Sequence, residues 1–590
     1  MASTFFGLGI GTSGLLTYQA AINVTANNIS NAQTDGYSRQ ELVQSAARPV
    51  SVGTGYGMLG SGVIATDIIQ IRDQYYDEKY RTNSATYGEY STKEKYMTEV
   101  ENYFNDLEKD GFTTCFSYLS TSLQELLKDP TSLSVRTQVI NYSENLTDYF
   151  KSIAKNLQSI QEDCNNEIKS TIDRINSIGE QLAVLTKQIN TVEINGVRAN
   201  ELRDQRELLI DELSQYCNVS VKEVQAGTAA GVNTYSVKIN GQTLVDTYES
   251  NSLACVPRSD SSNLSDIDGL YDVTWDNGNQ FKLVDCGGTL QSLYEVRDGN
   301  NKENLTGKVT GEAGDTTITM TGASINDIAK LNINRSGFIQ VGSREYEYTS
   351  FDIKVEDDGT YTYTFELASG LKSNVDNVST SIGEAVDYKG IAYYQSELNE
   401  FARTFSSAFN EILNGGVDLN GDTGKDLFNA TSPTTGDNYE FSEDKTSFDI
   451  NSSYYNMTAL NFNINKEIVA DVSKLATASS VTDGVSNTEI LNKLIGCLED
   501  KSMFNQGTPA SFLQALIAEI GIDTSKAKEF SESQKNILSS IDNQRLSEMG
   551  VDEDEEAVNL ITYQSAYNYS AKVIQVMSEV LDKLINETGV

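Results

Sequence analysis

Apolar residues recur with alternating spacings of three and four at both ends of the chain. Near the start, the a and d positions of one heptad register are occupied by Leu8, Gly11, Leu15, Tyr18, Ile22, Thr25 and Ile29. Near the end, the corresponding series is Leu560, Tyr563, Tyr567, Ser570, Ile574, Met577, Leu581 and Leu584. This spacing predicts two terminal helices, each with one narrow apolar stripe. An isolated helix of this kind is marginal in water, so the stripes are expected to pair with each other or with copies of themselves in an assembly.

The start of the second terminal helix is marked by polar residues. Asp552 is the expected N-cap, and Glu555 three residues later completes the pattern of a capping box. The acidic run from Asp552 to Glu556 also suits the positive end of a helix dipole. The beginning of this helix is therefore well defined.

Further helices are predicted between the terminal ones. They cover residues 67–107, 134–216, 394–412 and 508–547. Lys109 to Gly111 is expected to break the chain after the first segment, and Gly415-Gly416 ends the third. Turn chemistry within Asn195 to Glu201 divides the second segment into two helices.

Between residues 219 and 386 the period of the apolar residues changes to two. The segment TYSVKINGQTLVD carries Asn240-Gly241 between alternating residues, which is a strong hairpin signal. The segments GFIQVGSREYEYTSF and GTYTYTFEL alternate Tyr and Phe with polar residues. We therefore expect an antiparallel β insertion of one or two subdomains, whose tyrosines form the buried side of a sheet rather than an outward binding face. A smaller β or irregular patch is expected at residues 417–479.

Together these elements predict a multidomain α+β fold with nested domains, because the chain order folds back so that its two ends can meet. Residues 1–45 and 550–590 are expected to pair as a terminal coiled coil for assembly. Residues 46–217 and 388–549 are expected to form a rod of long helices, which includes the irregular patch. The β domain, residues 218–387, is inserted into this rod.

The charge of the chain argues against several classes of partner. Acidic residues outnumber basic ones by 84 to 44, which gives a net charge of −40. Such a surface repels phosphate backbones and anionic lipid, so neither nucleic acid nor a membrane is an expected partner. The chain contains no run of about 20 apolar residues, which is the length needed to span a bilayer. Its first residues lack the basic region of a secretory signal peptide. Export would need another route.

The composition also excludes most enzyme chemistry. The chain contains no histidine, which removes Ser-His-Asp and Cys-His nucleophiles, histidine metal sites and the commonest general base. It has no glycine-rich phosphate loop of the Walker or dinucleotide type. Six widely spaced cysteines are expected to be buried or half-buried free thiols: Cys115, Cys164, Cys217, Cys255, Cys286 and Cys497. We therefore expect no catalytic residue, no metal and no cofactor.

One loop has a weak likeness to a calcium site. The segment DLNGDTGKD places Asp418, Asn420, Asp422 and Asp426 at alternate positions. It departs from the EF-hand template, because Gly424 comes one place late and no Glu occupies the twelfth position. The segment is better interpreted as a surface turn.

Four segments, taken in chain order, resemble one family. The segment SGLLTYQAAINVTANNISNAQTDGYSRQ, residues 13–40, resembles the N-terminal signature of bacterial flagellar axial proteins, and its TDGYSRQ ending is typical of the hook-associated protein 1 family. Three later segments are similar to that family: ANELRDQRELLIDELSQYCNVSV (199–221), GVDLNGDTGKDLF (416–428) and GVDEDEEAVNLITYQSAYNYSAKVIQVMSEVLDKLI (550–585). Only the β insertion has no matching segment.

The resemblance implies a structural part of the bacterial flagellum. Such a subunit polymerises as a ring at the hook–filament junction and joins hook to filament, with the hook protein and hook-associated protein 3 as neighbours. Its paired terminal helices form the inner wall of the assembly, and the inserted sheet faces outward. Export through the flagellar type III route is also implied, with a cytoplasmic chaperone on the C-terminal helix.

The resemblance gives the polar segment ANNISNAQTDGYSRQ a role at a joint between inner wall and rod. Asn27, Asn28 and Asn31 are expected to hydrogen-bond neighbouring backbone there or an adjacent subunit, and Gly36 permits a positive φ. An ordinary helix C-cap followed by a loop is the alternative. Besides these four residues, the candidate assembly interface comprises Leu8, Leu15, Tyr18, Ile22, Ile29, Leu560, Tyr563, Tyr567, Ile574, Met577, Leu581 and Leu584.

Glycines in the first helix suggest a further expectation. Gly7, Gly9, Gly11 and Gly14 weaken local helix formation. The terminal segments are therefore expected to be disordered in the isolated subunit and to become ordered on assembly.

Three other functions stay open at this point. The β insertion suits a secreted adhesin or binding module, whose terminal helices would be dispensable. A secreted hydrolase would need two carboxylates facing each other across a cleft about 5 to 9.5 Å wide, and no local pattern marks such a pair. Hook-associated protein 3 is another axial protein with similar ends, although it is usually shorter.

Overall fold

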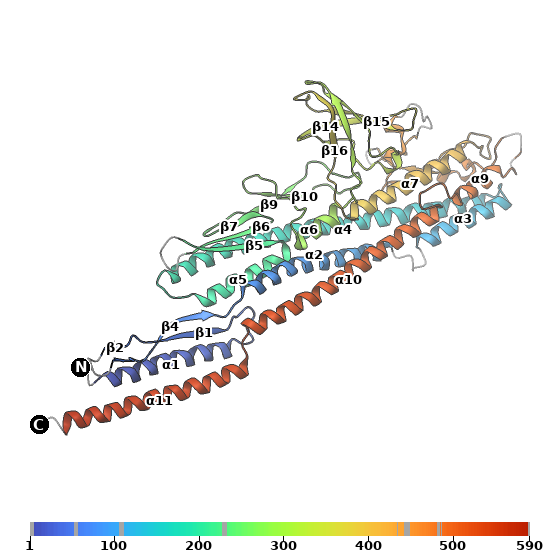
Figure 1. Cartoon of the computed structure of the whole chain (residues 1–590). Coiled ribbons are helices and arrows are strands. Elements are labelled where there is room, and N and C mark those ends of the chain that lie inside the picture. The colour runs from blue at the N-terminus through green and yellow to red at the C-terminus, as the bar shows by residue number, and fades with distance from the viewer. Residues whose placement is uncertain are drawn as a thin grey trace.

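The chain folds into an elongated molecule whose two ends lie side by side at one tip (Figure 1). The computed structural model describes residues 5–51, 57–104, 111–226, 233–432, 435–441, 449–480, 484 and 486–587. The N-terminal and C-terminal helices form the tip, long helices form the body, and a β-barrel projects from the side of the body (Figure 1). The predicted multidomain α+β class is confirmed.

The tip, which we call the terminal unit, combines two helices with a hairpin. Helix α1 (Phe6–Ser30) and helix α11 (Glu553–Asn586) lie side by side, as the two stripes predict. The hairpin pairs β1 (Gln40–Ala46) antiparallel with β4 (Val63–Gln70). Two short strands, β2 (Val50–Ser51) and β3 (Met58–Leu59), extend it.

The hairpin corrects one sequence prediction. Residues 67–70 were expected to begin a helix, but they are the end of β4, and helix α2 begins only at Gln74. The run VIATDIIQ is rich in β-branched residues, which favour a strand over a helix. The hairpin itself was also not predicted, because its pairing joins strands that are separated by the segment from residue 47 to residue 62.

The body consists of several long helices and two short ones, which share one continuous apolar core. The helices are α2 (Gln74–Phe104), α3 (Phe112–Lys128), α4 (Leu133–Glu193), α5 (Asn200–Tyr216), α7 (Ile391–Asn414), α8 (Lys466–Ala470), α9 (Glu489–Leu498) and α10 (Pro509–Met549). The predicted break between α4 and α5 is confirmed, and Gly196 takes a φ of 80° there. Gly415 caps α7, also as predicted. Of the predicted break at Lys109 to Gly111, the first two residues lie outside the described ranges, and Gly111 is the N-cap of α3.

The first part of the β insertion lies along the body (Figure 1). One sheet has the order β5-β6-β7-β8, and a separate pair joins β9 to β10. The strands are β5 (Val219–Gln225), β6 (Asn233–Ile239), β7 (Gln242–Asp246), β8 (Glu249–Ser250), β9 (Leu253–Pro257) and β10 (Tyr271–Trp275). Asn240 and Gly241 have φ values of 44° and 75°, so both are left-handed, as a two-residue hairpin turn requires. This predicted hairpin is confirmed.

Helix α6 (Gly288–Asp298) interrupts the insertion and was not predicted. It contacts α2 and α4, and nine of its residues are buried. A short helix that is buried on most sides has little amphipathic period, so its pattern resembles that of a buried strand.

The second part of the insertion is a closed six-stranded barrel with its own core. Its strands follow the order β11-β12-β15-β14-β13-β16. They are β11 (Leu305–Gly311), β12 (Thr317–Thr321), β13 (Gly337–Val341), β14 (Arg344–Val355), β15 (Tyr361–Leu367) and β16 (Val375–Ile382). Tyr346, Tyr348 and Tyr363 are buried in the barrel core, which confirms the predicted burial of the alternating tyrosines.

Arg403 of α7 fastens the barrel to the body. Its side chain is buried, and it donates to the carbonyl oxygens of Leu331 at 2.7 Å, Tyr455 at 2.8 Å and Met457 at 2.8 Å. Leu331 follows the short helix η1 (Ile328–Lys330) between β12 and β13, so this contact joins the barrel to α7. Burial lowers the pKa of the guanidinium to about 10, which still leaves it charged at neutral pH.

The patch predicted at residues 417–479 is mainly irregular. It contains β17 (Phe428–Ala430) paired with β18 (Phe462–Ile464), and three single turns, η2 (Ile450–Ser452), η3 (Tyr454–Asn456) and η4 (Val472–Lys474). In the calcium-like loop, the Asp418 carboxylate accepts from the backbone N–H groups of Asn420 and Asp422 at 2.7 and 2.9 Å. Asp418 therefore stabilises its own turn. No cluster of three metal-ligating side chains occurs within the described ranges.

The remaining chain-wide expectations concern cysteines and membrane spans. Five cysteines are buried and Cys255 is half-buried, as predicted, and all six are free thiols. In the part of the chain that the structure describes, no helix has both the length and the apolar character needed to cross a membrane.

Candidate assembly interface

The two terminal helices approach each other closely because α1 presents glycines to α11. A Cβ atom added at Gly7, Gly11 or Gly14 would lie 2.5, 2.7 or 2.7 Å from Met577, Ile574 or Ser570. Gly11 is the tightest of these positions, because backbone atoms of Ile574 and Ser570 also lie 3.4 Å from its added Cβ atom, so a large side chain there would push the helices apart. The expectation that the glycines loosen isolated ends is therefore replaced, because both segments are helical and packed within one chain.

The predicted stripes meet each other at this contact. Most of the predicted stripe positions are half-buried: Leu8, Leu15, Tyr18, Ile22, Ile29, Leu560, Tyr563, Tyr567, Ile574, Met577 and Leu581. Leu584, one turn from the end of α11, is exposed. Their half-burial shows that a two-helix contact covers only part of each side chain. These residues remain candidates for contact with a neighbouring subunit.

A second apolar face of α11 was missed in the sequence. Val558, Ile561, Tyr569, Val573, Val576 and Val580 are all exposed. Four of them, at 569, 573, 576 and 580, repeat the same spacing of four, three and four that marks the inner stripe. The sequence therefore contains the spacing of this outer face as well as that of the inner stripe.

The hairpin packs on another side of α1 through a strand edge. The Thr17 hydroxyl donates to the carbonyl oxygen of Val63, and the Val63 N–H donates to the Ser13 hydroxyl, both at 3.4 Å. Gly62 takes a φ of 105°, and a Cβ atom there would lie 2.1 Å from Ser13 Oγ. Helix α1 thus lies between the hairpin and α11 (Figure 1).

The asparagines in the last turn of α1 and at its C-cap hold the chain where it folds back on itself. Asn28 is buried, donates to the carbonyl oxygen of Gln40 at 2.9 Å, and accepts from the Gln40 N–H at 3.0 Å. Asn27 donates to the Tyr37 hydroxyl at 3.1 Å, and that hydroxyl donates to Asn28 at 2.8 Å. Asn31 donates to the carbonyl oxygen of Asn27 at 3.0 Å. The amides thus make contacts within the subunit, as one of the expected roles required.

Gly36 allows the returning chain to lie against the body. Its φ is 76°, and a Cβ atom there would lie 3.2 Å from a methyl group of Leu208 on α5. The positive φ expected from the sequence is confirmed, and the contact places the turn at the joint between the terminal unit and the body.

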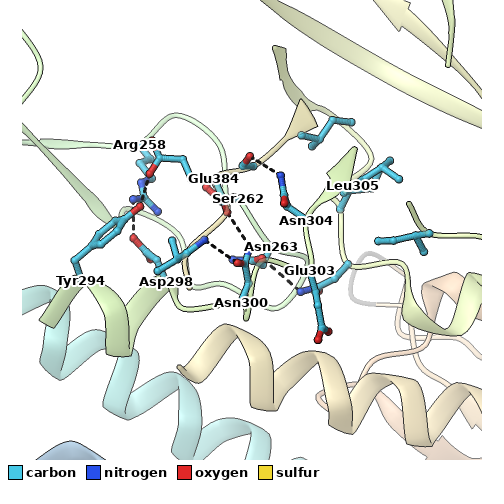
Figure 2. A pocket seen from close by; sticks show the side chains of 16 residues that line it. Arg258, Ser262, Asn263, Tyr294, Asp298, Asn300, Glu303, Asn304, Leu305 and Glu384 are labelled. Atoms are coloured by element: carbon cyan, nitrogen blue, oxygen red, sulfur yellow. Dashed lines mark hydrogen bonds and ion pairs between the residues drawn. The ribbon is translucent and has the colours of Figure 1, made fainter. Parts of the chain in front are cut away.

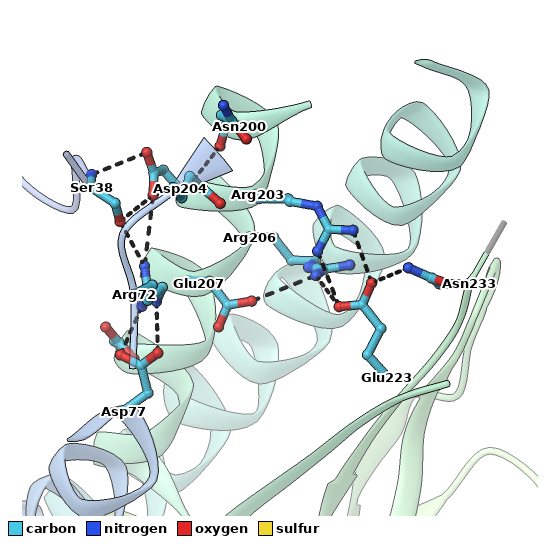
Figure 3. Close-up of polar contacts among 12 residues, drawn as sticks. Ser38, Arg72, Asp77, Asn200, Arg203, Asp204, Arg206, Glu207, Glu223 and Asn233 are labelled. Atoms are coloured by element: carbon cyan, nitrogen blue, oxygen red, sulfur yellow. Dashed lines mark hydrogen bonds and ion pairs between the residues drawn. The ribbon is translucent and has the colours of Figure 1, made fainter. Parts of the chain in front are cut away.

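Buried charges hold this joint together (Figure 3). Ser38 donates to Asp204 from its N–H at 3.2 Å and from its hydroxyl at 2.7 Å, and Gln70 donates to the same carboxylate at 2.8 Å. Burial raises the pKa of Asp204, although these hydrogen bonds and Arg72 favour its charged form. Asp204 belongs to the segment 199–221 that resembles a family motif, so the motif supplies the central acceptor of the joint.

The charges continue as an alternating series through the body. Arg72 contacts Asp77 at 2.7 Å, and Arg545 of α10 contacts Asp77 at 3.0 Å and also Asp211. Arg81 contacts Asp211 at 3.0 Å. We call Arg72, Asp77, Arg81, Asp211 and Arg545 the joint network. It ties α2, α5 and α10 together where the terminal unit begins.

A second contact fixes the angle between α10 and α11. The Arg39 N–H donates to the carbonyl oxygen of Met549 at 2.8 Å, and its guanidinium contacts Glu555 and Glu556, each at 2.9 Å. The Asp552 carboxylate accepts from the N–H groups of Asp554 and Glu555, which confirms the N-cap. Glu555 differs from a capping-box residue, because its carboxylate accepts from Arg39.

The surfaces of the terminal unit are unusual for so acidic a chain. Residues 1–34, 49–66 and 557–571 contain no Asp, Glu, Lys or Arg, although the whole chain has a net charge of −40. These ranges cover α1, the outer part of the hairpin and the part of α11 that follows its acidic first turn. A surface without charges can be covered by another molecule without the cost of burying ions.

A small polar pocket lies at the base of the barrel (Figure 2). Its volume is about 30 Å³, which holds about one water molecule rather than a substrate. Asn304 donates to the carbonyl oxygen of Gly383 at 3.3 Å, so the chain enters and leaves the barrel side by side. Asp298 in this pocket contacts Arg258 at 2.8 Å and Arg297 at 2.7 Å.

Asp298 predicts a pH dependence of stability. Burial alone raises its pKa, but Arg258 and Arg297 lower it to about 2. Because the unfolded pKa is about 3.9, Asp298 stabilises the fold above pH 4, and this stability, about 2 to 3 kcal/mol, is lost as the pH falls toward 2. An Asp298→Asn variant should lack this component, so the difference in unfolding free energy between the native chain and the variant should shrink as the pH falls from about 4.5 to about 2.5. Urea unfolding followed by fluorescence of the single tryptophan, Trp275, tests it, and parallel pH profiles would contradict it.

Comparison with known proteins decides the family. The model described as "Flagellar hook-associated protein FlgK helical domain" matches residues 97–344 and 331–428, which together exceed half of the chain. The chain belongs to the FlgK family. The resemblance of its sequence to hook-associated protein 1 is thereby confirmed.

The ends of this FlgK family member match two further models. One, "Flagella basal body rod protein", matches residues 8–37, and the other, "Flagellar basal body rod FlgEFG protein C-terminal", matches residues 542–587. These ranges contain α1 and α11. The two helices of the terminal unit are therefore similar in sequence to flagellar basal body rod proteins.

Two full-length relatives agree with this assignment. Flagellar hook-associated protein 1 of Bacillus subtilis is 26% identical over 100% of this chain and 99% of its own length. Flagellar hook-associated protein 1 of Escherichia coli is 26% identical over 97% of this chain and 98% of its own. The solved flagellar hook junction protein FlgK from Burkholderia pseudomallei has 14% identity and a TM-score of 0.45, with 80% of this chain and 100% of that chain covered.

Proposed function

We propose that this protein is a structural subunit that polymerises at the hook–filament junction of the bacterial flagellum and joins hook to filament. The FlgK family match over residues 97–428 carries this proposal. The terminal unit supports it, because its uncharged and partly exposed helices suit a surface that neighbouring subunits cover. A structural role also fits a chain without histidine.

The proposal assigns a role to each region. Residues 1–45 and 550–590 form the assembly domain, residues 46–217 and 388–549 form the rod, and residues 218–387 face outward. The predicted stripes contribute their half-exposed side chains to contacts between subunits. Asn27, Asn28, Asn31 and Gly36 act indirectly, since they set the joint from which the assembly domain projects.

The partners follow from the position in the flagellum. Copies of this chain would form a ring, with the hook protein on one side and hook-associated protein 3 on the other. The subunit would be secreted through the flagellar type III route, with a cytoplasmic chaperone holding the C-terminal helix beforehand. It acts as an assembled part and performs no catalysis.

The test is complementation in a flagellated strain from which the chromosomal copy has been deleted. The full chain should restore attached filaments, whereas a chain ending before Gly550 should leave hooks bare and shed flagellin into the medium. Electron microscopy and a flagellin immunoblot of the culture supernatant measure both outcomes. A truncated chain that still restores filaments would contradict the assembly role of α11, and a full chain without effect would contradict the function.

A further inference from the structure

The outer face of α11 is a second apolar stripe, and it is exposed among the residues that the structure describes. Tyr569 is 74% exposed, and Val573, Val576 and Val580 are 44%, 46% and 49% exposed. Their spacing places all four on one side of the helix, while Ile574 and Met577 face the glycines of α1. Helix α11 therefore has two apolar faces: the inner one packs on α1, and the outer one is left open by the described part of the chain.

The hairpin carries the other large apolar surface of the terminal unit. Its exposed residues include Val43, Val50, Met58, Leu59 and Ile64, and Met58 is 70% exposed. No charged residue occurs between positions 49 and 66. The hairpin and the outer face of α11 are thus alike in exposing several large apolar side chains.

These two surfaces lie at the same level of the molecule. Gly11 of α1 faces Ile574, which is the neighbour of Val573. Gly62, two residues before Ile64, faces Ser13 and Ile10 of α1. Both surfaces therefore flank the segment of α1 near residues 10–13, but α1 lies between them, so they do not meet within one subunit (Figure 1).

We propose that the outer face of α11 docks on the hairpin of a second copy of this chain, in a head-to-tail contact. This inference rests on the proposed function, because it names the surfaces by which the subunits polymerise. A contact between two different surfaces leaves one of each free at the ends of every pair, so it repeats until a ring closes or a filament grows. The shared level lets a lateral neighbour make the contact without a large axial shift.

Other arrangements leave more apolar surface uncovered. A symmetric contact between two copies of the outer face of α11 would stop at a dimer and leave both hairpins exposed. A contact with the exposed side of a neighbouring α1 would meet Thr12, Gln19 and Asn23, whose polar groups lose solvent on burial. The hairpin is the surface that covers apolar groups with apolar groups.

Disulfide cross-linking in assembled flagella tests the contact. Val573→Cys and Ile64→Cys are introduced into a Cys255→Ser parent, separately and together, in the deletion strain, and isolated flagella are oxidised. The doubly substituted chain should give a ladder of dimers, trimers and larger species on non-reducing gels. Each single variant should remain monomeric. A chain with Val573→Cys and Val184→Cys, which is on exposed α4 surface, is the matched control.

Each result decides the inference. A strong dimer from Val573→Cys alone would replace the contact with a symmetric one, and a ladder from Val573→Cys with Leu16→Cys would assign the docking site to α1. No ladder above the control, in strains whose filaments are restored, would overturn the contact and leave the proposed function intact. Val576→Cys with Leu59→Cys gives a second pair if the first impairs assembly. A parent that restores no filaments would instead contradict the function.

Discussion

A Gly11→Leu variant is expected to separate the two terminal helices and to abolish attached filaments. A leucine at this position would overlap Ile574, whose side chain lies 2.7 Å and whose backbone nitrogen lies 3.4 Å from the added Cβ atom. Overpacking of this kind costs about 1 to 3 kcal/mol, so the opened form of the pair should become roughly 5- to 150-fold more populated. In the purified Gly11→Leu variant, trypsin should cut after Lys572 in α11 faster than it does in the native chain.

Gly9→Leu is the matched control for this prediction. Gly9 lies in the same helix, two residues away, and nothing lies within 4 Å of its added Cβ atom. Both variants exchange glycine for leucine, so they share any effect of helix propensity. Equal trypsin rates in the two purified variants would show that α11 gains no protection from α1, and the assembly role of the pair would lose its structural basis.

An Arg545→Met variant is expected to lose more unfolding free energy than any other variant proposed for this protein. Arg545 is buried between Asp77 and Asp211, and its removal leaves two buried carboxylates with fewer positive neighbours. Breaking a buried ion pair by removing one partner costs about 3 to 5 kcal/mol. We expect a value near the lower bound, because Arg72 still contacts Asp77 and Arg81 still contacts Asp211. Urea unfolding followed by circular dichroism measures the change.

Lys128→Met provides the comparison for the joint network. Lys128 also contacts a carboxylate, Glu125 at 2.7 Å, but the two side chains are 69% and 48% exposed. An exposed pair contributes at most about 1 kcal/mol, so this variant should unfold close to the native midpoint. A loss below about 1 kcal/mol for Arg545→Met would mean that water already screens the network, and the joint would then depend on its apolar contacts.

Local chemistry made much of the fold predictable from the sequence. Asp552 caps α11 with its own side chain, and Asn240-Gly241 turns between β6 and β7 because both residues tolerate a positive φ. The apolar series from Leu146 to Ile175 is buried along α4 because a long helix keeps a regular apolar side. In each case the determining residues are neighbours in sequence.

The missed features depend on contacts between distant residues. Helix α6 is defined by its burial against α2 and α4, and closure of the barrel requires β11 to pair with β16. The joint combines Ser38, Arg72, Asp204 and Arg545, which no local pattern groups. Spacing alone did not show that glycines of α1 fit Met577 and Ile574.

The candidate interface was predictable only in part. The inner stripes were found because their spacing is regular, but spacing does not tell whether a stripe faces its own chain or a neighbour. The structure shows that they face each other, and the outer face of α11 became visible only when exposure was known. Contacts between subunits, and the boundaries of the three nested domains, stay predictions.

The adjacent strands at the base of the barrel have a consequence for what the rod can display. Residues 304 and 383 share a hydrogen bond, so they lie next to each other. If the segment between them were removed, a short linker could rejoin the two ends. Such an exchange must also change residues of the body that contact the excised segment, because Arg403 and Tyr455 would lose carbonyl partners and Glu400 would lose its contact with Lys330. The barrel is therefore a site at which another domain can be inserted into this subunit, provided that the exposed polar contacts left on α7 are also replaced.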